Sequence, residues 1–538
     1  MTPTRRPRFR RYRDGACRPA LAAATLLFCT AYVPVAHALD GAETRGKQIY
    51  FGGTSASGGT INAVVGDEAV TLPGSAVTCA SCHGSDGLGR PEGGVLPPDV
   101  RWSELAKTYG HVHENGRRHP AFDDASLARS IFAGVDSADN QLDRAMPLYQ
   151  MSSEDMADLI AYMKVLENDL DPGIDQSRVQ VATLLPLQGR ASALGQAMAQ
   201  VMHGYFAGIN EQGGVFGRRI ELLAVPMGDS PETGLDNLQQ AFEAEGVFAL
   251  VGAYTVGLDD ALLTLLRDDN IPLVGPFTLD PGDSFIDAAA FYLYSGFDEQ
   301  ARVLANRALA DGAEPQQVLV AGPDDDRIDG LVSAVKDQLR QRGGGTAPNV
   351  ERYAAGEFDA AALAGKLGDD GSKTLIFLGG HPELQQLLAE LADQDQVPLV
   401  YVLSSLTSAS LFDMPAAFDQ KIFVAFPTLS SDVTPAGREE FKELAERAAL
   451  PTEHVQAQLA AFAAAKVLVE GLRRAGRDLS RVRLIAGLEQ LYRFETGVTP
   501  PLTYGPNRRI GARGAHVLAV DIANRTYLPV GIGWYEAR

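Results

Sequence analysis

The sequence is poor in cysteine, with only four in 538 residues. Two of them, Cys17 and Cys29, lie in an N-terminal segment that we expect to be removed. So few cysteines exclude a disulfide framework of the kind that holds small secreted domains together. The other two, Cys79 and Cys82, therefore need a different explanation.

Motifs of several common enzyme classes are absent as well. The sequence has no phosphate-binding loop of the G-x-x-x-x-G-K-[ST] type and no G-x-S-x-G nucleophile elbow. Apart from the stretch around Cys79 it contains no metal-binding motif. Scattered acidic residues such as Asp324 to Asp326 are typical of a solvated surface, so no hydrolytic or nucleotide-dependent site is predicted.

Positive charge is concentrated at the N-terminus. Residues 1–38 contain seven Arg and a single Asp, and include an apolar run from Pro19 to Val35 before the cleavage signature Ala36-His37-Ala38. This order is that of a secretory signal peptide. The apolar run is short for a bilayer span, and no later segment replaces it. We therefore expect a periplasmic protein, cleaved near Ala38, with no membrane span in the mature chain.

The rest of the chain is acidic. The full sequence carries 47 Lys and Arg against 68 Asp and Glu, a net charge of −21, and removal of residues 1–38 brings it to about −27. Such a surface disfavours nucleic acids and anionic membranes and favours cationic partners. About 500 residues with 45% hydrophobic content can bury several cores, so we expect more than two compact units.

The most informative stretch is Cys79-Ala80-Ser81-Cys82-His83. Two thiols three positions apart can each form a thioether to one edge of a porphyrin, and the histidine that follows is placed to bind iron. A thioredoxin-type pair would need a surrounding βαβ pattern, and a zinc site would need a second ligand pair; neither is visible. The motif therefore predicts one covalently attached haem c, with His83 as an iron ligand.

The chain around this motif, from about residue 39 to residue 167, resembles a class I cytochrome c. Residues 43–50 look like the N-terminal helix of that family, with Gly46 and Tyr50 one turn apart. Ser152 and Asp155 favour the start of a later helix, whose apolar face comprises Met156, Leu159, Ile160 and Met163. The resemblance implies a small all-α domain in which these two helices cross beside the haem edge.

In this family the methionine of a Met-Pro pair ahead of the last helix is the sixth iron ligand. Met146-Pro147 matches that pair, so the resemblance implies that Met146 binds iron opposite His83. The family also implies that a proline carbonyl, here of Pro97 or Pro98, holds the ring of His83. The alternative ligands are Met151 and three histidines of a polar loop, His111, His113 and His119.

The chain departs from the family pattern by an insert at residues 51–78, ahead of the cysteines. Two short apolar stretches, Thr60–Val65 and Ala69–Leu72, flank Gly66-Asp67 and predict a β-hairpin. The hairpin covers the haem edge, forms a docking surface or is an inert decoration, and the sequence leaves these readings open.

A change of pattern follows residue 167. Residues 168–177 are polar with a Pro-Gly pair, which predicts a linker between a domain of residues 39–167 and one of residues 178–538. Beyond it, strand-like and helix-like stretches alternate over some 360 residues, which indicates parallel sheets in two lobes with helices on both faces. We expect a helix over residues 195–212 and strands over residues 179–185, 220–225, 249–252, 272–275, 317–321, 374–378, 399–403 and 422–425.

This second domain resembles the leucine/isoleucine/valine-binding family of periplasmic receptors, the substrate-binding proteins of ABC transporters. The matching stretches, in order along the chain, are residues 185–189, 209–218, 270–278, 497–501 and 505–511. The resemblance implies a type I periplasmic-binding-protein fold, whose two discontinuous lobes close over a ligand.

The family's ligand-binding positions correspond to Gln188, Tyr254, Thr255, Phe277 and Thr278. Thr255 and Thr278 stand where hydroxyl donors hold an amino-acid carboxylate in the family, although capping of a loop is the alternative role. Residues 291–294 and 322–326 depart from the family pattern. The resemblance therefore leaves open whether the ligand is an amino acid.

Together these features predict a periplasmic c-type cytochrome that transfers single electrons and is not an enzyme. Its receptor-like module would bind a small organic ligand or dock a redox partner, such as a periplasmic dehydrogenase or oxidase. The alternative is an ABC-transporter receptor that serves a membrane permease and carries haem as a redox or sensing attachment. An enzyme with an open haem site is disfavoured because Met146 is available as a ligand.

Overall fold

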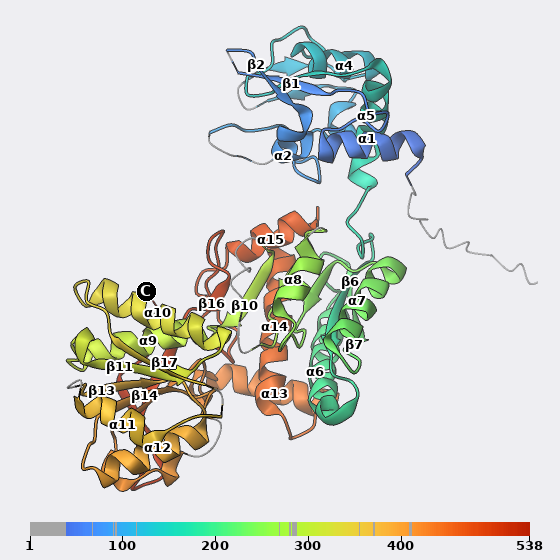
Figure 1. Cartoon of the computed structure of the whole chain (residues 1–538). Coiled ribbons are helices and arrows are strands. Elements are labelled where there is room, and N and C mark those ends of the chain that lie inside the picture. Colours follow the sequence, from blue (N-terminus) through green and yellow to red (C-terminus); the bar gives the residue numbers. More distant parts are fainter. Residues whose placement is uncertain are drawn as a thin grey trace, which may run out of the picture. The chain divides into compact units, whose positions relative to one another are not determined.

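The computed structural model describes residues 39–537 apart from residues 67, 90, 92–93, 114–115, 268, 279–280, 282–287, 355, 370–371 and 408–410. The predicted signal peptide and its cleavage position near Ala38 lie outside the described residues. The described chain forms a small, mostly helical region up to residue 169 and a larger α/β region from residue 178 (Figure 1). Each region has buried apolar residues of its own.

The helical region begins with α1 (Gly41–Gly52) and ends with α5 (Ser153–Val165). Ser152 starts α5 as predicted, because its hydroxyl accepts a hydrogen bond from the backbone N–H of Asp155 at 3.0 Å. On the predicted apolar face of α5, Leu159, Ile160 and Met163 are buried. The helices between them are α2 (Cys79–His83), α3 (Trp102–Leu105) and α4 (Asp124–Ala133).

Helices α1 and α5 approach each other closely at Gly46. Tyr50, one turn further along α1, is buried, and its ring centroid lies 5.6 Å from that of Tyr162 on α5. A Cβ atom on residue 46 would lie 2.0 Å from the backbone oxygen of Asp158 on α5, which is well inside van der Waals contact. The crossing therefore requires glycine at this position.

We expect Gly46→Ala to destabilise the helical region by about 1–3 kcal/mol, because an added methyl group at a close contact forces the backbone to shift. Urea unfolding of the full-length protein, followed by the absorbance of the haem, measures this change. Gly41→Ala on the same helix is the matched control, since a Cβ there comes no closer than 3.5 Å to a neighbouring atom. Equal midpoints for the two variants would contradict the close crossing.

The insert at residues 51–78 forms the predicted hairpin. Strands β1 (Asn62–Val65) and β2 (Val70–Pro73) pair in antiparallel fashion. The free edge of β1 pairs with β5 (Leu148–Gln150), which places Ala63 opposite Tyr149. The insert is thus one part of a three-stranded sheet, and this sheet is an addition to the otherwise helical domain. A separate two-stranded pair joins β3 (His111–Val112) to β4 (Arg118–His119).

The first sheet of the α/β region has the strand order β16-β10-β9-β8-β6-β7, and its strands pair in parallel. The strands are β6 (Arg178–Leu185), β7 (Arg219–Pro226), β8 (Ala249–Val251), β9 (Leu273–Val274), β10 (Ala290–Tyr294) and β16 (Ile510–Ala512). The helices of this lobe are α6 (Ser192–Glu211), α7 (Pro231–Glu245), α8 (Asp259–Arg267), α13 (Pro435–Ala448), α14 (Val455–Ala475) and α15 (Arg481–Glu489).

The second sheet has the order β12-β11-β13-β14-β15-β17-β18. Its strands are β11 (Val318–Pro323), β12 (Asn349–Tyr353), β13 (Thr374–Phe377), β14 (Leu399–Leu403), β15 (Ile422–Phe426), β17 (Gly514–Asp521) and β18 (Thr526–Glu536). Its helices are α9 (Phe297–Ala310), α10 (Asp326–Arg342), α11 (Ala360–Asp369) and α12 (His381–Asp393). The predicted strands are present and largely parallel, while β17 and β18 add an antiparallel edge.

Helix α14 is the one described helix that is long and apolar enough to cross a membrane by length and composition. In its most apolar stretch of 18 residues, 78% are buried in the protein. Ala464 of this helix is fully buried and lies against Gly275, directly after β9. Burial of this extent is that of a core helix in an α/β fold.

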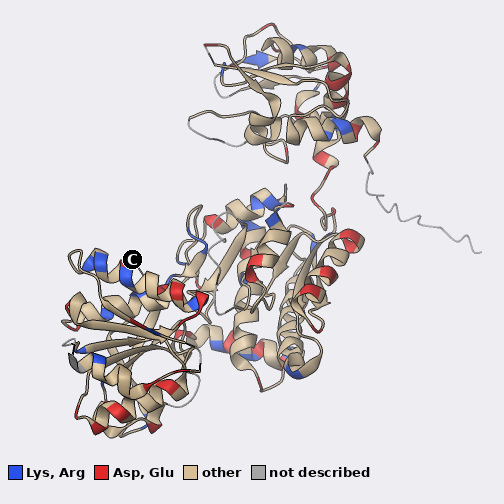
Figure 2. Ribbon diagram, in the orientation of Figure 1, with Lys and Arg blue, Asp and Glu red and all other residues tan. Residues whose placement is uncertain are grey.

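The charges are distributed over many elements of the surface (Figure 2). Helix α7 carries four acidic residues and no basic one, whereas α15 begins with Arg481 and contains Arg483 (Figure 2). Acidic and basic residues are therefore distributed unequally among the helices of the α/β region.

Candidate haem site and ligand site

The helical turn α2 carries the predicted haem-binding residues. Thr78 caps it, since its hydroxyl accepts a hydrogen bond from the backbone N–H of Ser81 at 3.2 Å. The turn places the thiols of Cys79 and Cys82 and the imidazole of His83 on a stretch of five residues. Both thiols are free, which the formation of two thioethers requires.

The ring of His83 is held in one orientation. The side chain is 7% exposed, and its Nδ1 donates a hydrogen bond to the backbone oxygen of Pro98 at 3.0 Å. Of the two prolines expected for this role, the structure therefore identifies Pro98. Burial lowers the pKa of His83, although the Pro98 carbonyl acts in the opposite direction. A neutral ring with its Nδ1 occupied offers Nε2 to a metal, so these residues fit a covalently attached haem.

Two tyrosine hydroxyls fix the backbone on either side of α2. Tyr50 of α1 donates to the backbone oxygen of Gly84 at 2.8 Å, and Tyr149 of β5 donates to that of Val77 at 2.8 Å. In the sequence, Tyr50 indicates only the first helix, and no pattern predicts a role for Tyr149. Both residues restrain the position of the haem-attachment turn from a distance in sequence.

Met146 lies at the entrance to β5, where its backbone N–H donates to the oxygen of Asp143 at 3.0 Å. Its side chain is half-buried and packs against the same apolar core as Cys79 and Met151. Because β1 pairs with β5, the hairpin insert fixes the segment that follows Met146. Met146 and Met151 both border the core, so the assignment of Met146 as the sixth ligand stays a prediction.

The three loop histidines contact one another instead of standing apart. His113 Nε2 lies 2.8 Å from Nη2 of Arg117 and 3.0 Å from Nε2 of His119. Nδ1 of His119 donates to the oxygen of Pro120 at 2.8 Å, and the ring of His111 lies 4.5 Å from that of His113. His113 and His119 thus have ring nitrogens engaged with neighbouring groups, and Nδ1 of His111 lies 3.6 Å from Oε2 of Glu104 on α3, which disfavours the three histidines as alternative iron ligands.

This cluster predicts a pH dependence of stability. Burial, together with the positive charge of Arg117, lowers the pKa of His113 from 6.5 to about 4. Between pH 6.5 and pH 4 the imidazole of His113 takes up a proton in the unfolded chain but not in the folded chain. The contribution of His113 to the free energy of unfolding is therefore fully present above pH 6.5 and is lost as the pH falls toward 4. Urea midpoints at pH 7 and pH 5 measure this loss. His113→Gln should reduce the difference, while the exposed His454→Gln should not, and equal behaviour of both variants would contradict the prediction.

Four of the five predicted ligand-binding residues lie together at the carboxyl ends of β8 and β9. The backbone N–H of Thr255 donates to the oxygen of Phe277 at 3.1 Å, and Tyr254 and Phe277 stack with ring centroids 5.9 Å apart. Thr278 follows directly. Gln188 lies in the loop after β6, the strand next to β8. The carboxyl edge of a parallel sheet is where such folds bind ligands.

One functional candidate, Asp259, is missed by the sequence interpretation. It is the first residue of α8, and its carboxylate accepts hydrogen bonds from the hydroxyls of both Thr255 and Thr278. The one feature of the sequence that could have indicated this role is that Asp259 lies four residues after Thr255. That spacing identifies a partner only once the chain is known to turn into a helix at this point.

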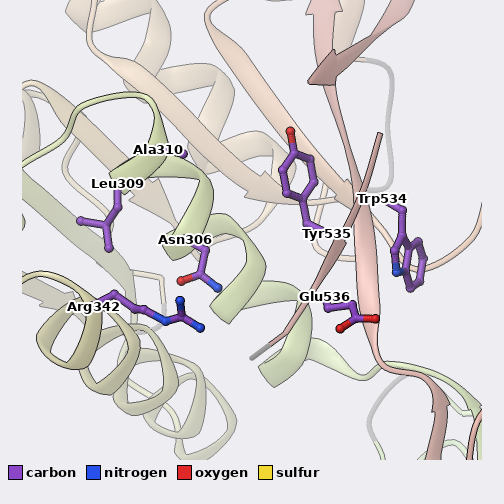
Figure 3. Close-up of a pocket in the computed structure, with 7 residues that line it drawn as sticks. All are labelled: Asn306, Leu309, Ala310, Arg342, Trp534, Tyr535 and Glu536. Carbon is purple, nitrogen blue, oxygen red and sulfur yellow. The ribbon is translucent and has the colours of Figure 1, made fainter. Parts of the chain in front are cut away.

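A surface cavity of about 660 Å³ lies elsewhere, between α9, α10 and β18 (Figure 3). None of the five predicted ligand-binding residues lines it. Figure 3 shows Leu309 and Asn306 on one side and the strand residues Trp534 to Glu536 on the other. We regard this cavity as separate from the candidate ligand site.

Comparison with known proteins supports two families. A cytochrome c model matches residues 74–167, and a periplasmic binding protein model matches residues 178–524. Leu/Ile/Val-binding protein homolog 2 of Brucella abortus is 22% identical over 223 residues, 41% of this chain and 59% of that protein. The Leu/Ile/Val-binding protein of Escherichia coli is 19% identical over 212 residues, 39% of this chain and 57% of that protein. The chain thus spans less than two thirds of these relatives.

A crystal structure from Rhodospirillum rubrum, named for branched-chain amino acid ABC transport, is similar with a TM-score of 0.54. It is 17% identical and covers 66% of this chain and 100% of that one, which supports the fold alone. The cytochrome c match implies covalently bound haem in the region of Cys79 and Cys82. Because the binding-protein model covers more than half of the chain, this chain belongs to the periplasmic binding protein family and carries a cytochrome c domain ahead of that module.

Proposed function

We propose that this protein is a periplasmic electron carrier with one covalent haem, fused to a receptor-like module that binds a small organic ligand. The observation that carries the proposal is the setting of His83: buried, held by Pro98 and preceded by two free thiols on one turn. A bound haem supplies a one-electron Fe(III)/Fe(II) couple. Binding-protein relatives support the periplasmic location and a small ligand.

The chain's own residues orient the groups that would hold the haem. The Pro98 carbonyl fixes the His83 ring, and the Tyr50 and Tyr149 hydroxyls hold the backbone around α2. We propose that Met146, which lies just before the strand that pairs with the hairpin, would hold the haem iron together with His83. A haem iron held by both side chains would be closed to substrate, so the protein would transfer electrons without acting as an enzyme.

Exposure of the dithionite-reduced, full-length protein to carbon monoxide tests this closed site. We expect the Soret spectrum to remain unchanged, because an iron bound by both His83 and Met146 would have no position for carbon monoxide. Met146→Ala serves as the positive control, because loss of its thioether leaves a position for carbon monoxide. Rapid binding by the wild-type protein would contradict the proposal and favour an open-haem enzyme.

A second candidate function is that of a receptor for an ABC permease, and the match of residues 178–524 to binding proteins favours it. A thermal-shift screen of the full-length protein with small ligands, repeated in the oxidised and the reduced state, separates the two functions. Shifts that are the same in both states favour the receptor. Shifts that depend on the redox state favour a ligand-responsive electron carrier that serves a dehydrogenase or an oxidase.

A further inference from the structure

The candidate ligand loops contain a carboxylate of the chain's own. The hydroxyl of Thr255 donates to Oδ1 of Asp259 at 2.6 Å, and the hydroxyl of Thr278 donates to Oδ2 at 2.9 Å. Thr255 is fully buried, and Asp259 is half-buried at the first turn of α8, where a helix favours negative charge. Each carboxylate oxygen therefore takes one of the two hydroxyl protons.

The family resemblance implies that the two threonine hydroxyls donate hydrogen bonds to a ligand, whereas in the structure they donate to Asp259. A threonine hydroxyl has a single proton to donate, and in both residues that proton points to Asp259. Neither of these hydroxyl protons is then available to a ligand. A carboxylate on the ligand would lack these two donors and would lie close to a group of like charge. Thr255 and Thr278 are therefore unsuited to hold an amino-acid carboxylate.

The residues directly before these threonines add aromatic surface. Tyr254 and Phe277 are half-buried, and their ring planes are inclined by 20° with centroids 5.9 Å apart. The backbones of the two residues form a parallel bridge, so both rings belong to one loop pair. The face of an aromatic ring attracts cations because of its quadrupole. The half-buried Asp259 carboxylate and the two aromatic rings together are complementary to an organic cation.

We propose that the module binds a small organic amine without a carboxylate group, and that Asp259 selects it. The ammonium group would be recognised by Asp259, and the hydrocarbon part by Tyr254 and Phe277. This inference rests on the proposed function, because it assumes that the receptor-like module binds a small ligand. It narrows the ligand from an unspecified organic molecule to a cation.

Matched probes test the inference on the full-length oxidised protein. 3-Methylbutylamine is leucine without its carboxylate, and 2-phenylethylamine stands in the same relation to phenylalanine; 3-methylbutanol removes the charge while keeping the carbon skeleton. Isothermal titration and thermal shift give the affinities. We expect at least one of the two amines to bind about tenfold more tightly than its matching amino acid. If 3-methylbutylamine binds, we expect its affinity to be about tenfold higher than that of 3-methylbutanol.

Variants assign the preference to the carboxylate. Asp259→Asn keeps the shape and removes the charge, so we expect the amine affinity to fall by about tenfold or more. Asp260→Asn, at the exposed next position, is the matched control and should leave the affinity unchanged. Asp259→Ala releases both threonine protons, so binding of the amino acid is expected to increase. Melting temperatures without probe show whether each variant is folded.

The outcomes separate this inference from the proposed function. Amino acids that bind the wild-type protein as tightly as the amines would overturn the inference, while ligand binding by the module would stand. An unchanged amine affinity in Asp259→Asn would also overturn it. Failure of every probe to bind would overturn the inference together with the ligand-binding part of the proposed function, whereas the proposal of electron transfer would be unaffected.

Discussion

Replacement of both Cys79 and Cys82 by serine is expected to abolish covalent haem attachment completely. A hydroxyl does not replace a thiol in a thioether, and the described residues offer no other cysteine. Haem staining of a denaturing gel and the intact mass of the exported protein measure the result. The wild-type chain should carry the mass of one haem, and the double variant none.

Ser81→Ala is the matched control for this experiment, because Ser81 lies on the same turn between the two cysteines and is exposed. Its hydroxyl donates only to the backbone oxygen of Thr78. This variant should retain covalent haem in full. Haem that stays attached to the double serine variant after denaturation would show that the attachment site lies elsewhere.

Under the proposal that Met146 is the sixth iron ligand, its replacement by alanine removes that ligand. The methionine thioether stabilises reduced iron, so its loss lowers the reduction potential and opens the iron to external ligands. The absorption band that marks methionine bound to oxidised iron should disappear entirely. Optical spectra of the oxidised protein, with a potential measured in the same sample, provide the test.

Met151→Ala is the matched control, since Met151 is also half-buried against the same core and lies just beyond β5. We expect this variant to keep the band and most of the potential. Loss of the band in Met151→Ala and its retention in Met146→Ala would identify Met151 as the ligand. Loss in neither variant would exclude both methionines.

Much of the fold follows from local patterns. The hydroxyl of Ser152 and the apolar face that includes Leu159 predict α5 because a cap and a helical period act within one or two turns. The strands of the α/β region are predictable for the same reason, since β6 and β14 are runs of mostly buried residues rich in Val and Leu. The C-x-x-C-H motif is likewise local, and Pro98 lies among its expected partners.

Contacts between distant segments are what the sequence does not reveal. The pairing of β1 with β5 joins residues more than 80 positions apart, and the Tyr149 hydroxyl reaches Val77 across 72 positions. No local periodicity specifies such a partner. The role of Asp259 has the same origin, because it depends on two loops that meet only when β8 and β9 pair. The antiparallel strands β17 and β18 are likewise not predicted, because the sequence analysis rests on alternation of strands and helices, which indicates parallel sheets.

The central claim, that one haem held by His83 and Met146 exchanges single electrons, is tested most directly by a potentiometric titration of the full-length protein followed by its visible spectrum. The account predicts one reversible transition with a slope of about 59 mV per tenfold change in the ratio of oxidised to reduced protein. The methionine band should be present at the oxidised end of that transition. Two transitions, an irreversible one, or an oxidised spectrum without methionine ligation would contradict the account.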